Sequence, residues 1–373
     1  MGAFSNSNKG AFRTAIVDPV GKKAGLDCYN DSLAKVLNSE NSIVKVYSNY
    51  SSKYSTSIFD FSFGRSILFI PKLILSYRKI LKILEVERFD SVIIHLFKAT
   101  KIDLWFLKKL KTEKIKCVCI LHDIENLLSE RASNGILQNC LGLVDNIIVH
   151  NLFSKKELLR LIPDLKERVE IVGHGDFLDL PSGVSKREAV QKLGLTNIKR
   201  KVLFFGMIKP SKGLDVLLKA MQGVDAELII AGRMRKHSFS EYSKLIQPLK
   251  AKNKIILDIN YITNEKRDLY FKVADIIVLP YRKIYQSGVL IMALSYKIPA
   301  VTSDLPPILE FVEDADCVHL FRDGDHEDLA VQINDLFLNE QKRKKLVENG
   351  ERKLKKSNNW GSIGNSFNRI LAK

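Results

Sequence analysis

The sequence predicts an α/β protein built from two doubly wound domains, each with a parallel sheet covered by helices. The chain has 373 residues, about twice the usual length of one domain. Short runs rich in valine, isoleucine and leucine alternate with longer segments of helical hydrophobic spacing, which is typical of buried parallel strands. The alternation stops at 173–200 and then starts again, so we expect a linker there and a domain boundary near residue 180.

Two series of short apolar runs are the candidate strands. The first series comprises residues 14–17, 43–47, 91–95, 117–121, 146–150 and 169–172, and the second comprises 202–205, 227–231, 255–259, 276–279, 300–302 and 317–320. We therefore expect Rossmann-like domains at 1–180 and 181–356, with the amphipathic end of the chain, 357–373, crossing back to the first domain. The carboxyl ends of both sheets would then line a shared cleft, where such folds bind ligands.

Composition restricts the class of protein. Hydrophobic residues make up 46% and charged residues 27% of the chain, which is ordinary for a folded globular protein. The five cysteines are scattered without metal-ligand spacing, so we expect reduced thiols in a cytosolic protein and no bound metal. The most apolar run, 67–84, is interrupted by basic residues and a proline, so no segment is expected to span a membrane.

The charge distribution predicts anionic partners. The formal net charge is +17, and residues 61–116 interleave lysines and arginines with apolar residues. Such a stretch is typical of a surface that lies on an anionic bilayer, and a helix packed on a sheet with a solvated basic face has the same pattern. Nucleic acid is not an expected partner, because the sequence has no recognition motif and no aromatic stacking pattern. We therefore expect a cytoplasmic protein held peripherally at the inner face of the cell membrane.

The sequence VLFFGMIKPSKG at 202–213 predicts a site for a phosphorylated ligand. A buried strand ends at Gly206, a short loop supplies Lys209 and Lys212, and Gly213 begins a helix whose free N–H groups face the loop. Two ammonium groups and a helix N-terminus can hold a diphosphate and neutralise the charge that develops as it leaves a sugar carbon. Two solvated lysines in a surface turn would have the same local sequence.

A second motif, at 275–294, has the same plan. A buried strand runs into the loop of Tyr281, and Ser287 and Gly288 begin an apolar helix. Serine is a common helix N-cap, and Gly288 allows a ligand to approach the backbone closely. A serine cap without any ligand is the alternative interpretation. Because both motifs follow strands of the same expected sheet, we expect their loops at the same edge of that sheet.

The first domain offers glycines and histidines at strand ends. Gly21 and Gly25 lie in the loop after the first strand, which lacks the three-glycine fingerprint of a nicotinamide site. A strand-end histidine can hydrogen-bond a sugar hydroxyl or a phosphate, although a lone one is more often structural. The histidines in question are His95, His122, His150 and His174.

Together these patterns resemble the GT-B glycosyltransferases, and in particular the large retaining family 4, over nearly the whole chain. The segments that carry the resemblance are FFGMIKPSKGLDVLLKA, AELIIAGR, ADIIVLPY followed by YQSGVL, IPAVTSDLPPILE and NNWGSIGNSF. The resemblance implies the GT-B fold, a nucleoside-diphosphate sugar as donor, and no metal or other cofactor. The QSGVL form is similar to one branch of the family.

The resemblance also implies roles for individual residues. The expected catalytic residues are Lys209 and Lys212, which would hold the donor diphosphate, and His122, which would lie beside the transferred sugar. Further donor contacts are expected from Gly206, Gly213, Tyr281, Ser287, Gly288, Val289 and Glu310. Acceptor or sugar contacts are expected from Gly21, Gly25 and His174. In retaining enzymes of this type the leaving phosphate is thought to help deprotonate the acceptor, so charge stabilisation matters more than a carboxylate base.

The sequence departs from the family pattern at two positions. Many members have a glutamate near the donor sugar and another on the ribose, and aligned on Pro299 those positions are Ile284 and Met292. Neither side chain can accept a hydrogen bond from ribose. The arginine that often follows the first glycine is Met207 here, and Lys209 is its expected substitute, as a point charge without the bidentate fork.

The function implied is transfer of a hexose to a lipid-linked saccharide during synthesis of a bacterial surface polysaccharide such as O-antigen, capsule or exopolysaccharide. GDP-mannose is the first candidate donor, and UDP-hexoses are the next. A sugar-nucleotide epimerase would use the same fold and the same paired lysines. A degenerate member that only binds a nucleotide sugar or scaffolds partners would account for the missing glutamates.

Overall fold

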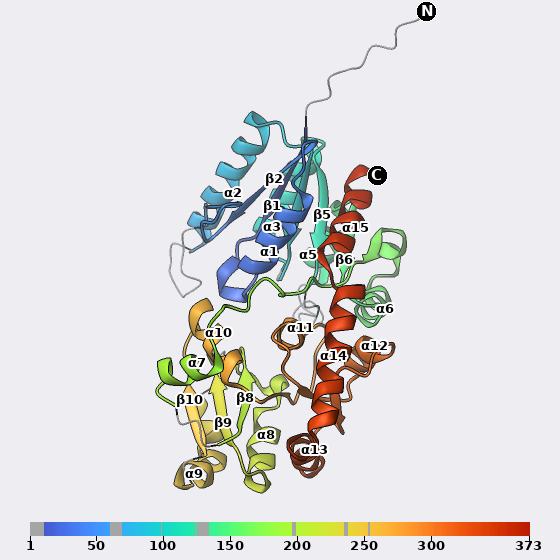
Figure 1. Ribbon diagram of the computed structural model, residues 1–373. Coiled ribbons are helices and arrows are strands. Elements are labelled where there is room, and N and C mark those ends of the chain that lie inside the picture. Colours follow the sequence, from blue (N-terminus) through green and yellow to red (C-terminus); the bar gives the residue numbers. More distant parts are fainter. Residues whose placement is uncertain are drawn as a thin grey trace, which may run out of the picture. The chain divides into compact units, whose positions relative to one another are not determined.

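A computed structural model describes residues 11–59, 69–97, 99–122, 124, 134–195, 199–234, 238–252 and 254–373. The chain divides into two compact units, which we call the first domain (Met1–Gly175 with Trp360–Lys373) and the second domain (Asp176–Asn359). Each domain has its own parallel sheet with helices packed beside it (Figure 1). The first eight residues of the basic apolar segment that begins at residue 61 lie outside the described residues.

The first sheet has seven strands in the order β3-β2-β1-β4-β5-β6-β7. β1 pairs in parallel with β2 on one side and with β4 on the other, so the sheet is wound in both directions from its middle. The strands are β1 (Phe12–Val17), β2 (Ser42–Ser48), β3 (Ser55–Ser57), β4 (Ser91–His95), β5 (Lys116–Ile120), β6 (Asn146–Val149) and β7 (Val169–Ile171).

The second sheet repeats this plan with six strands in the order β10-β9-β8-β11-β12-β13. β8 pairs in parallel with β9 and β11. The strands are β8 (Lys201–Phe205), β9 (Glu227–Ala231), β10 (Ile255–Asp258), β11 (Ile276–Leu279), β12 (Ala300–Ser303) and β13 (His319–Phe321). Two doubly wound parallel sheets confirm the α/β class predicted from the sequence.

Helices connect successive strands in both domains. The helices of the first domain are α1 (Asp27–Leu37), α2 (Phe69–Val86), α3 (Lys101–Thr112), α5 (Asn134–Leu143), α6 (Leu152–Leu161) and α15 (Trp360–Ala372). Those of the second are α7 (Lys186–Lys192), α8 (Leu214–Ala220), α9 (Ser243–Ala251), α10 (Asn264–Val273), α11 (Gly288–Ser295), α12 (Pro306–Val312), α13 (His326–Leu338) and α14 (Glu340–Ser357). Single 3₁₀ turns are η1 (Gly21–Ala24), η3 (Pro163–Arg168), η4 (Pro210–Lys212), η5 (Met221–Gly223) and η6 (Phe239–Tyr242). No helix in the described part of the chain is long and apolar enough to cross a bilayer.

The last helix, α15, belongs to the hydrophobic core of the first domain. Phe367 is fully buried in the apolar cluster that α1 and the sheet supply. Gly364 allows α15 and α1 to approach closely, since a Cβ at this position would lie 2.8 Å from Cγ2 of Val36. The Lys116 Nζ donates to the carbonyl oxygen of Ile370 at 2.6 Å. The end of the chain is therefore packed against α1 and the first sheet.

The topology indicates where each domain binds ligands. In a doubly wound sheet, ligands bind at the carboxyl edge where the strand order reverses. That point lies between β1 and β4 in the first sheet and between β8 and β11 in the second. In the first domain the Gly21 loop follows β1 and His95 is the last residue of β4. In the second domain the Lys212 loop follows β8, and Ser287 ends the loop after β11.

Candidate functional site

The loop after β8 carries both lysines predicted to bind a diphosphate. Lys209 and Lys212 flank the turn η4, which leads into α8. The turn ends at Gly213, whose φ of 66° is left-handed. A Cβ at Gly213 would lie 1.7 Å from the carbonyl oxygen of Pro280, which directly follows β11. Only glycine fits here, and its close approach joins the β8 loop to the β11 loop.

Polar contacts join the same two loops. The Arg282 N–H donates to the carbonyl oxygen of Ser211 at 3.0 Å. The Arg282 guanidinium also forms an ion pair with Asp215 on α8, with Nη2 and Oδ2 2.5 Å apart. The Lys212 Nζ lies 4.2 Å from the centre of the Tyr281 ring, within range of a cation–π interaction. The cation predicted to face a diphosphate is thus placed over a fixed aromatic ring.

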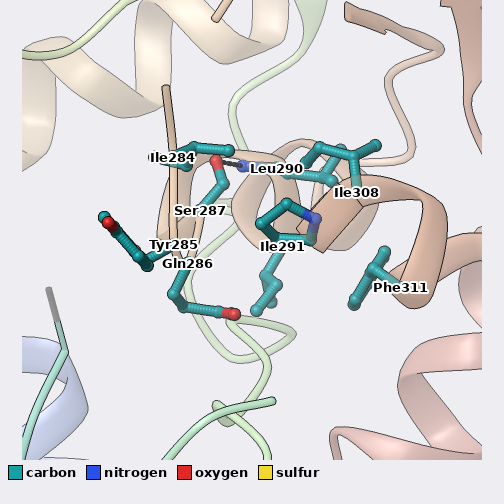
Figure 2. Close-up of a pocket in the computed structure, with 9 residues that line it drawn as sticks. Ile284, Tyr285, Gln286, Ser287, Leu290, Ile291, Ile308 and Phe311 are labelled. Carbon is teal, nitrogen blue, oxygen red and sulfur yellow. Dashed lines mark hydrogen bonds between the residues drawn. The ribbon is translucent and has the colours of Figure 1, made fainter. Parts of the chain in front are cut away.

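Tyr281 connects this lysine to the start of α11. The hydroxyl oxygens of Tyr281 and Ser287 are 2.7 Å apart, and both side chains are buried. Ser287 caps the helix, because its Oγ accepts the Leu290 N–H at 3.1 Å (Figure 2). Burial raises the pKa of Tyr281, so its hydroxyl stays neutral and available for this hydrogen bond. Gly206 lies nearby, since a Cβ there would touch Cγ2 of Val289 at 3.6 Å.

An apolar hollow lies beside the start of α11 (Figure 2). Its lining residues are Ile284, Tyr285, Gln286, Ser287, Leu290, Ile291, Pro307, Ile308 and Phe311. Ile284 and Met292 are the two positions that the sequence resemblance aligned with glutamates of family 4, and Met292 is 8% exposed within α11. Glu310 lies on α12 between Ile308 and Phe311 and is half-buried. The hollow is therefore lined mainly by apolar side chains, with Ile284 among them.

In the first domain, the buried carboxylate of Asp18 holds the glycine loop after β1 in place through hydrogen bonds. Its Oδ1 accepts the N–H groups of Val20 and Gly21, both at 2.9 Å, and its Oδ2 accepts from the Asn30 amide at 2.7 Å. Gly21 has a φ of 44°, and a Cβ there would lie 2.2 Å from the Ser48 hydroxyl oxygen. Gly25 has a φ of 73° with no atom within 4 Å of an added Cβ. Gly21 is thus required for packing, whereas Gly25 only shapes the backbone.

The strand-end histidines gather around Tyr29 on α1. Its ring lies edge-on to His122, with centroids 4.9 Å apart, and 5.0 Å from His174. The Tyr29 ring also contacts Trp360 of α15, with ring centroids 5.2 Å apart. Gly175 leaves room for that indole, since a Cβ there would lie 2.2 Å from it. The carboxyl edge of the first sheet is therefore an aromatic cluster to which the end of the chain contributes.

Three of these histidines form a chain of hydrogen bonds. The Nδ1 of His95 and the Nε2 of His122 are 2.8 Å apart, and the Nδ1 of His122 and the Nε2 of His150 are 2.9 Å apart. The Nδ1 of His150 lies 2.9 Å from the carbonyl oxygen of Val172. Both ring nitrogens of His122 are therefore engaged, and either can meet a ligand only by giving up one of these bonds.

Burial keeps the histidine cluster neutral near pH 7. It lowers the pKa of His150 to about 3 and that of His174 to about 4. Burial also lowers the pKa of His95, and it lowers the pKa of His122 well below its usual value, with the neighbouring histidines acting in the same direction. His122 is the partly exposed member, whereas the other three are buried.

A family model described as Glycosyl transferases group 1 matches residues 185–353. The matched range contains the lysine loop, Tyr281, Ser287 and Glu310. We call the part of the chain that matches this family, residues 185–353, the group 1 domain. This domain holds every residue predicted to contact the donor diphosphate or nucleotide, whereas His122, His174, Gly21 and Gly25 belong to the first domain.

Curated relatives of the chain include two mannosyltransferases. The chain is 26% identical over 221 residues to the phosphatidyl-myo-inositol mannosyltransferase of Mycobacterium leprae, covering 56% of this chain and 57% of the relative. It is 26% identical over 107 residues to the GDP-mannose:glycolipid 4-beta-D-mannosyltransferase of Xanthomonas campestris, covering 28% of this chain and 31% of the relative. The match therefore spans little more than half the length of the first relative and about a third of the second.

Solved structures match the chain over nearly its full length. The sucrose-phosphate synthase of Thermosynechococcus elongatus superposes with a TM-score of 0.76 at 17% identity, covering 97% of this chain and 98% of that one. Anabaena HepE, solved in complex with UDP and glucose, also gives a TM-score of 0.76 at 17% identity, covering 97% and 99%. With the two parallel sheets, these likenesses confirm the GT-B fold class that the sequence resemblance implied.

Proposed function

We propose that the chain is a retaining glycosyltransferase that moves a hexose from a nucleoside-diphosphate sugar to a lipid-linked saccharide. The observation that carries the proposal is the cluster at the β8–β11 edge of the group 1 domain. There Lys212, held over Tyr281, and the N-terminus of α11, capped by Ser287, belong to one connected set of contacts. Both features attract a diphosphate, and both stabilise the charge it gains on leaving the sugar.

The same cluster supports a reaction without a metal ion. Metal-dependent transferases place a divalent cation on the departing diphosphate, and Lys209 with Lys212 would supply two positive charges for that purpose. Because these charges are fixed before the reaction begins, little reorganisation is needed when the bond breaks. Addition of EDTA should leave the rate of transfer unchanged.

Two lines of support suggest the donor. The two mannosyltransferase relatives, one of which is named for GDP-mannose, make GDP-mannose the first candidate. The complex of Anabaena HepE with UDP and glucose makes a UDP-hexose the second. The apolar residues Ile284 and Met292 remove two carboxylates that many family members have. We therefore expect this chain to hold the ribose through other groups of the β11–α11 loop.

The acceptor side of the proposal rests on α2. Its buried face consists of Leu73, Tyr77, Ile80 and Leu84, which pack in the first domain. The opposite face exposes Lys72, Leu75, Lys79, Lys82 and Val86 at helical spacing. We call these five residues the α2 stripe. Exposed apolar side chains among lysines are suited to the surface of an anionic bilayer, where a lipid-linked acceptor and a peripheral enzyme would meet.

The deciding measurement is a thermal-shift panel of GDP-, UDP-, dTDP- and CMP-sugars in EDTA. A ligand at 100 times its Kd stabilises the folded state by about 2.7 kcal/mol, so one nucleotide should raise the Tm clearly. The matching nucleoside, which lacks the diphosphate, should raise it far less. A panel in which no nucleotide sugar shifts the Tm, with or without acceptor lipid and vesicles, would contradict the proposal.

A transfer assay with the donor so identified separates the reactions that share this fold. A transferase consumes the donor only when an acceptor is present, and a retaining one conserves the anomeric configuration of the sugar. Donor consumed without acceptor, with an epimeric sugar as product, would indicate an epimerase instead. Donor bound but never consumed with any lipid-linked saccharide would indicate a binding protein.

A further inference from the structure

The hydrogen bonds of the histidine chain determine which nitrogen carries each proton. The carbonyl oxygen of Val172 can only accept, so the Nδ1 of His150 carries a hydrogen. A neutral His150 then has a bare Nε2, which accepts from the Nδ1–H of His122. The Nε2 of His122 is bare in turn and accepts from the Nδ1–H of His95. One backbone carbonyl thus sets the tautomer of three rings.

His95 is the last ring in this series of hydrogen bonds, and its second ring nitrogen has no partner among the described residues. The Nε2 of His95 is buried and has no hydrogen-bond partner among the described residues. The charged group near it is Asp18, at the end of the neighbouring strand β1. Asp18 already accepts from the glycine loop and from Asn30 and has no hydrogen to give while ionised. In each of the three neutral rings, the hydrogen is therefore on Nδ1, and Nε2, the nitrogen farther from Val172 along the series, is bare.

We propose that His150 is a positioning residue, which with the Val172 carbonyl fixes His122 as a hydrogen-bond acceptor at Nε2 and selects a ligand hydroxyl over a phosphate oxygen. The inference rests on the proposed function, because it concerns the group that a sugar offers to His122. His122 is the partly exposed ring of the chain. A hydroxyl that takes the place of His95 brings the proton that the bare Nε2 needs, whereas a phosphate oxygen brings none.

The tautomers are measured directly on the free protein. With ¹⁵N-labelled histidine, the ring-nitrogen chemical shifts distinguish an N–H from a bare nitrogen. At pH 7 we expect Nδ1–H and bare Nε2 on His95, His122 and His150. An Nε2–H on neutral His122, or a doubly protonated ring, overturns the inference. No substrate is involved, so this result is independent of whether transfer is ever observed.

Two substitutions at His150 test the positioning role. In His150→Gln a carboxamide oxygen can lie near the place of Nε2 and accept from the Nδ1–H of His122. In His150→Asn the shorter side chain can reach Val172 but offers no acceptor to His122. We expect His122 to keep its tautomer in the glutamine variant and to become a mixture of tautomers in the asparagine variant.

Kinetics then distinguish positioning from packing. We expect kcat/KM to fall about tenfold further in His150→Asn than in His150→Gln, the effect of about one net hydrogen bond. Equal losses in the two variants, with the His122 tautomer unchanged in both, would make His150 merely structural and overturn the inference. Wild-type spectra with the expected tautomers but no transfer to any acceptor would refute the proposed function while leaving the tautomer assignment intact.

Discussion

At the scale of single residues, substitution of Lys212 is the most direct test of the proposed chemistry. The ammonium nitrogen of Lys212 lies 4.2 Å from the centre of the Tyr281 ring. We expect Lys212→Ala to cost about 2–4 kcal/mol of transition-state stabilisation, comparable to the loss of one preorganised charge-stabilising donor. The measurement is kcat/KM with the donor identified by the thermal-shift panel. Lys219→Ala, an exposed lysine on α8, is the matched control and should act as wild type. A near-wild-type rate for Lys212→Ala would remove this residue from the mechanism.

Two glycines make a matched pair for the backbone beneath the site. Gly213 and Gly25 both have left-handed φ, 66° and 73°. An added Cβ at Gly213 would meet the Pro280 carbonyl oxygen at 1.7 Å, whereas at Gly25 it would meet nothing within 4 Å. Gly25→Ala should therefore lose only about 1–2 kcal/mol of unfolding free energy. Gly213→Ala should lose about 1–3 kcal/mol more through overpacking. Equal losses in urea unfolding would show that the two loops can separate without cost.

At the scale of elements, the sequence predicted the sheets well because parallel strands are buried on both faces. Runs such as 227–231 and 276–279 were predicted with the observed bounds. The strand missed is β3, Ser55–Ser57, which is short, polar and at the edge of its sheet. An edge strand is held by backbone hydrogen bonds on one side and needs no apolar residues. The amino-acid sequence of β3 is therefore not distinguishable from that of a loop.

The candidate site was predictable to the extent that it depends on local sequence. A strand, a glycine and two lysines follow one another at 202–213. The two motifs indicated loops at the same edge of the sheet, and in the structure Lys212 lies over the ring of Tyr281, whose hydroxyl meets that of Ser287. What sequence reasoning missed depends on sheet order. Asp18 as the anchor of the glycine loop, and the bonds that join His95, His122 and His150, arise because their strands are neighbours in space. Histidines at the ends of successive strands were the available signal.

The α2 stripe makes a prediction about membrane binding. Leu75 and Val86 are 61% and 69% exposed, and burying such side chains in a bilayer interface adds to the attraction of the lysines for anionic lipid. We expect the protein to sediment with anionic vesicles at moderate salt, and the double variant Leu75→Asp with Val86→Asp to lose most of that binding. Leu338→Asp, at an 84% exposed position of the second domain, should bind as wild type. Failure of the wild-type protein to sediment would sink the idea.

At the scale of the whole molecule, the buried histidines make the first domain acid-sensitive. Unfolded histidines have a pKa near 6.5, whereas in the folded state those of His150 and His174 are lowered to about 3 and 4. Below pH 6.5 the unfolded chain therefore binds protons that the folded cluster does not, so stability is full above pH 7 and falls as the pH drops from 6.5 towards 4. Over this range the loss should reach on the order of a few kcal/mol.

The two tryptophans allow this loss to be located. The chain has two, Trp105 and Trp360, and both belong to the first domain. Tryptophan fluorescence therefore reports the first domain, while far-ultraviolet circular dichroism reports both. In an acid titration at fixed, low denaturant, we expect the fluorescence transition to occur at higher pH than the main loss of helical signal. The reason is that the group 1 domain has, among its described residues, one partly buried histidine of lowered pKa, His319. Coincident transitions would mean that the domains unfold as one unit. A fluorescence signal that stays constant down to pH 4 would mean that the cluster takes up protons without cost, which would require ring nitrogens far more accessible to water than their burial indicates.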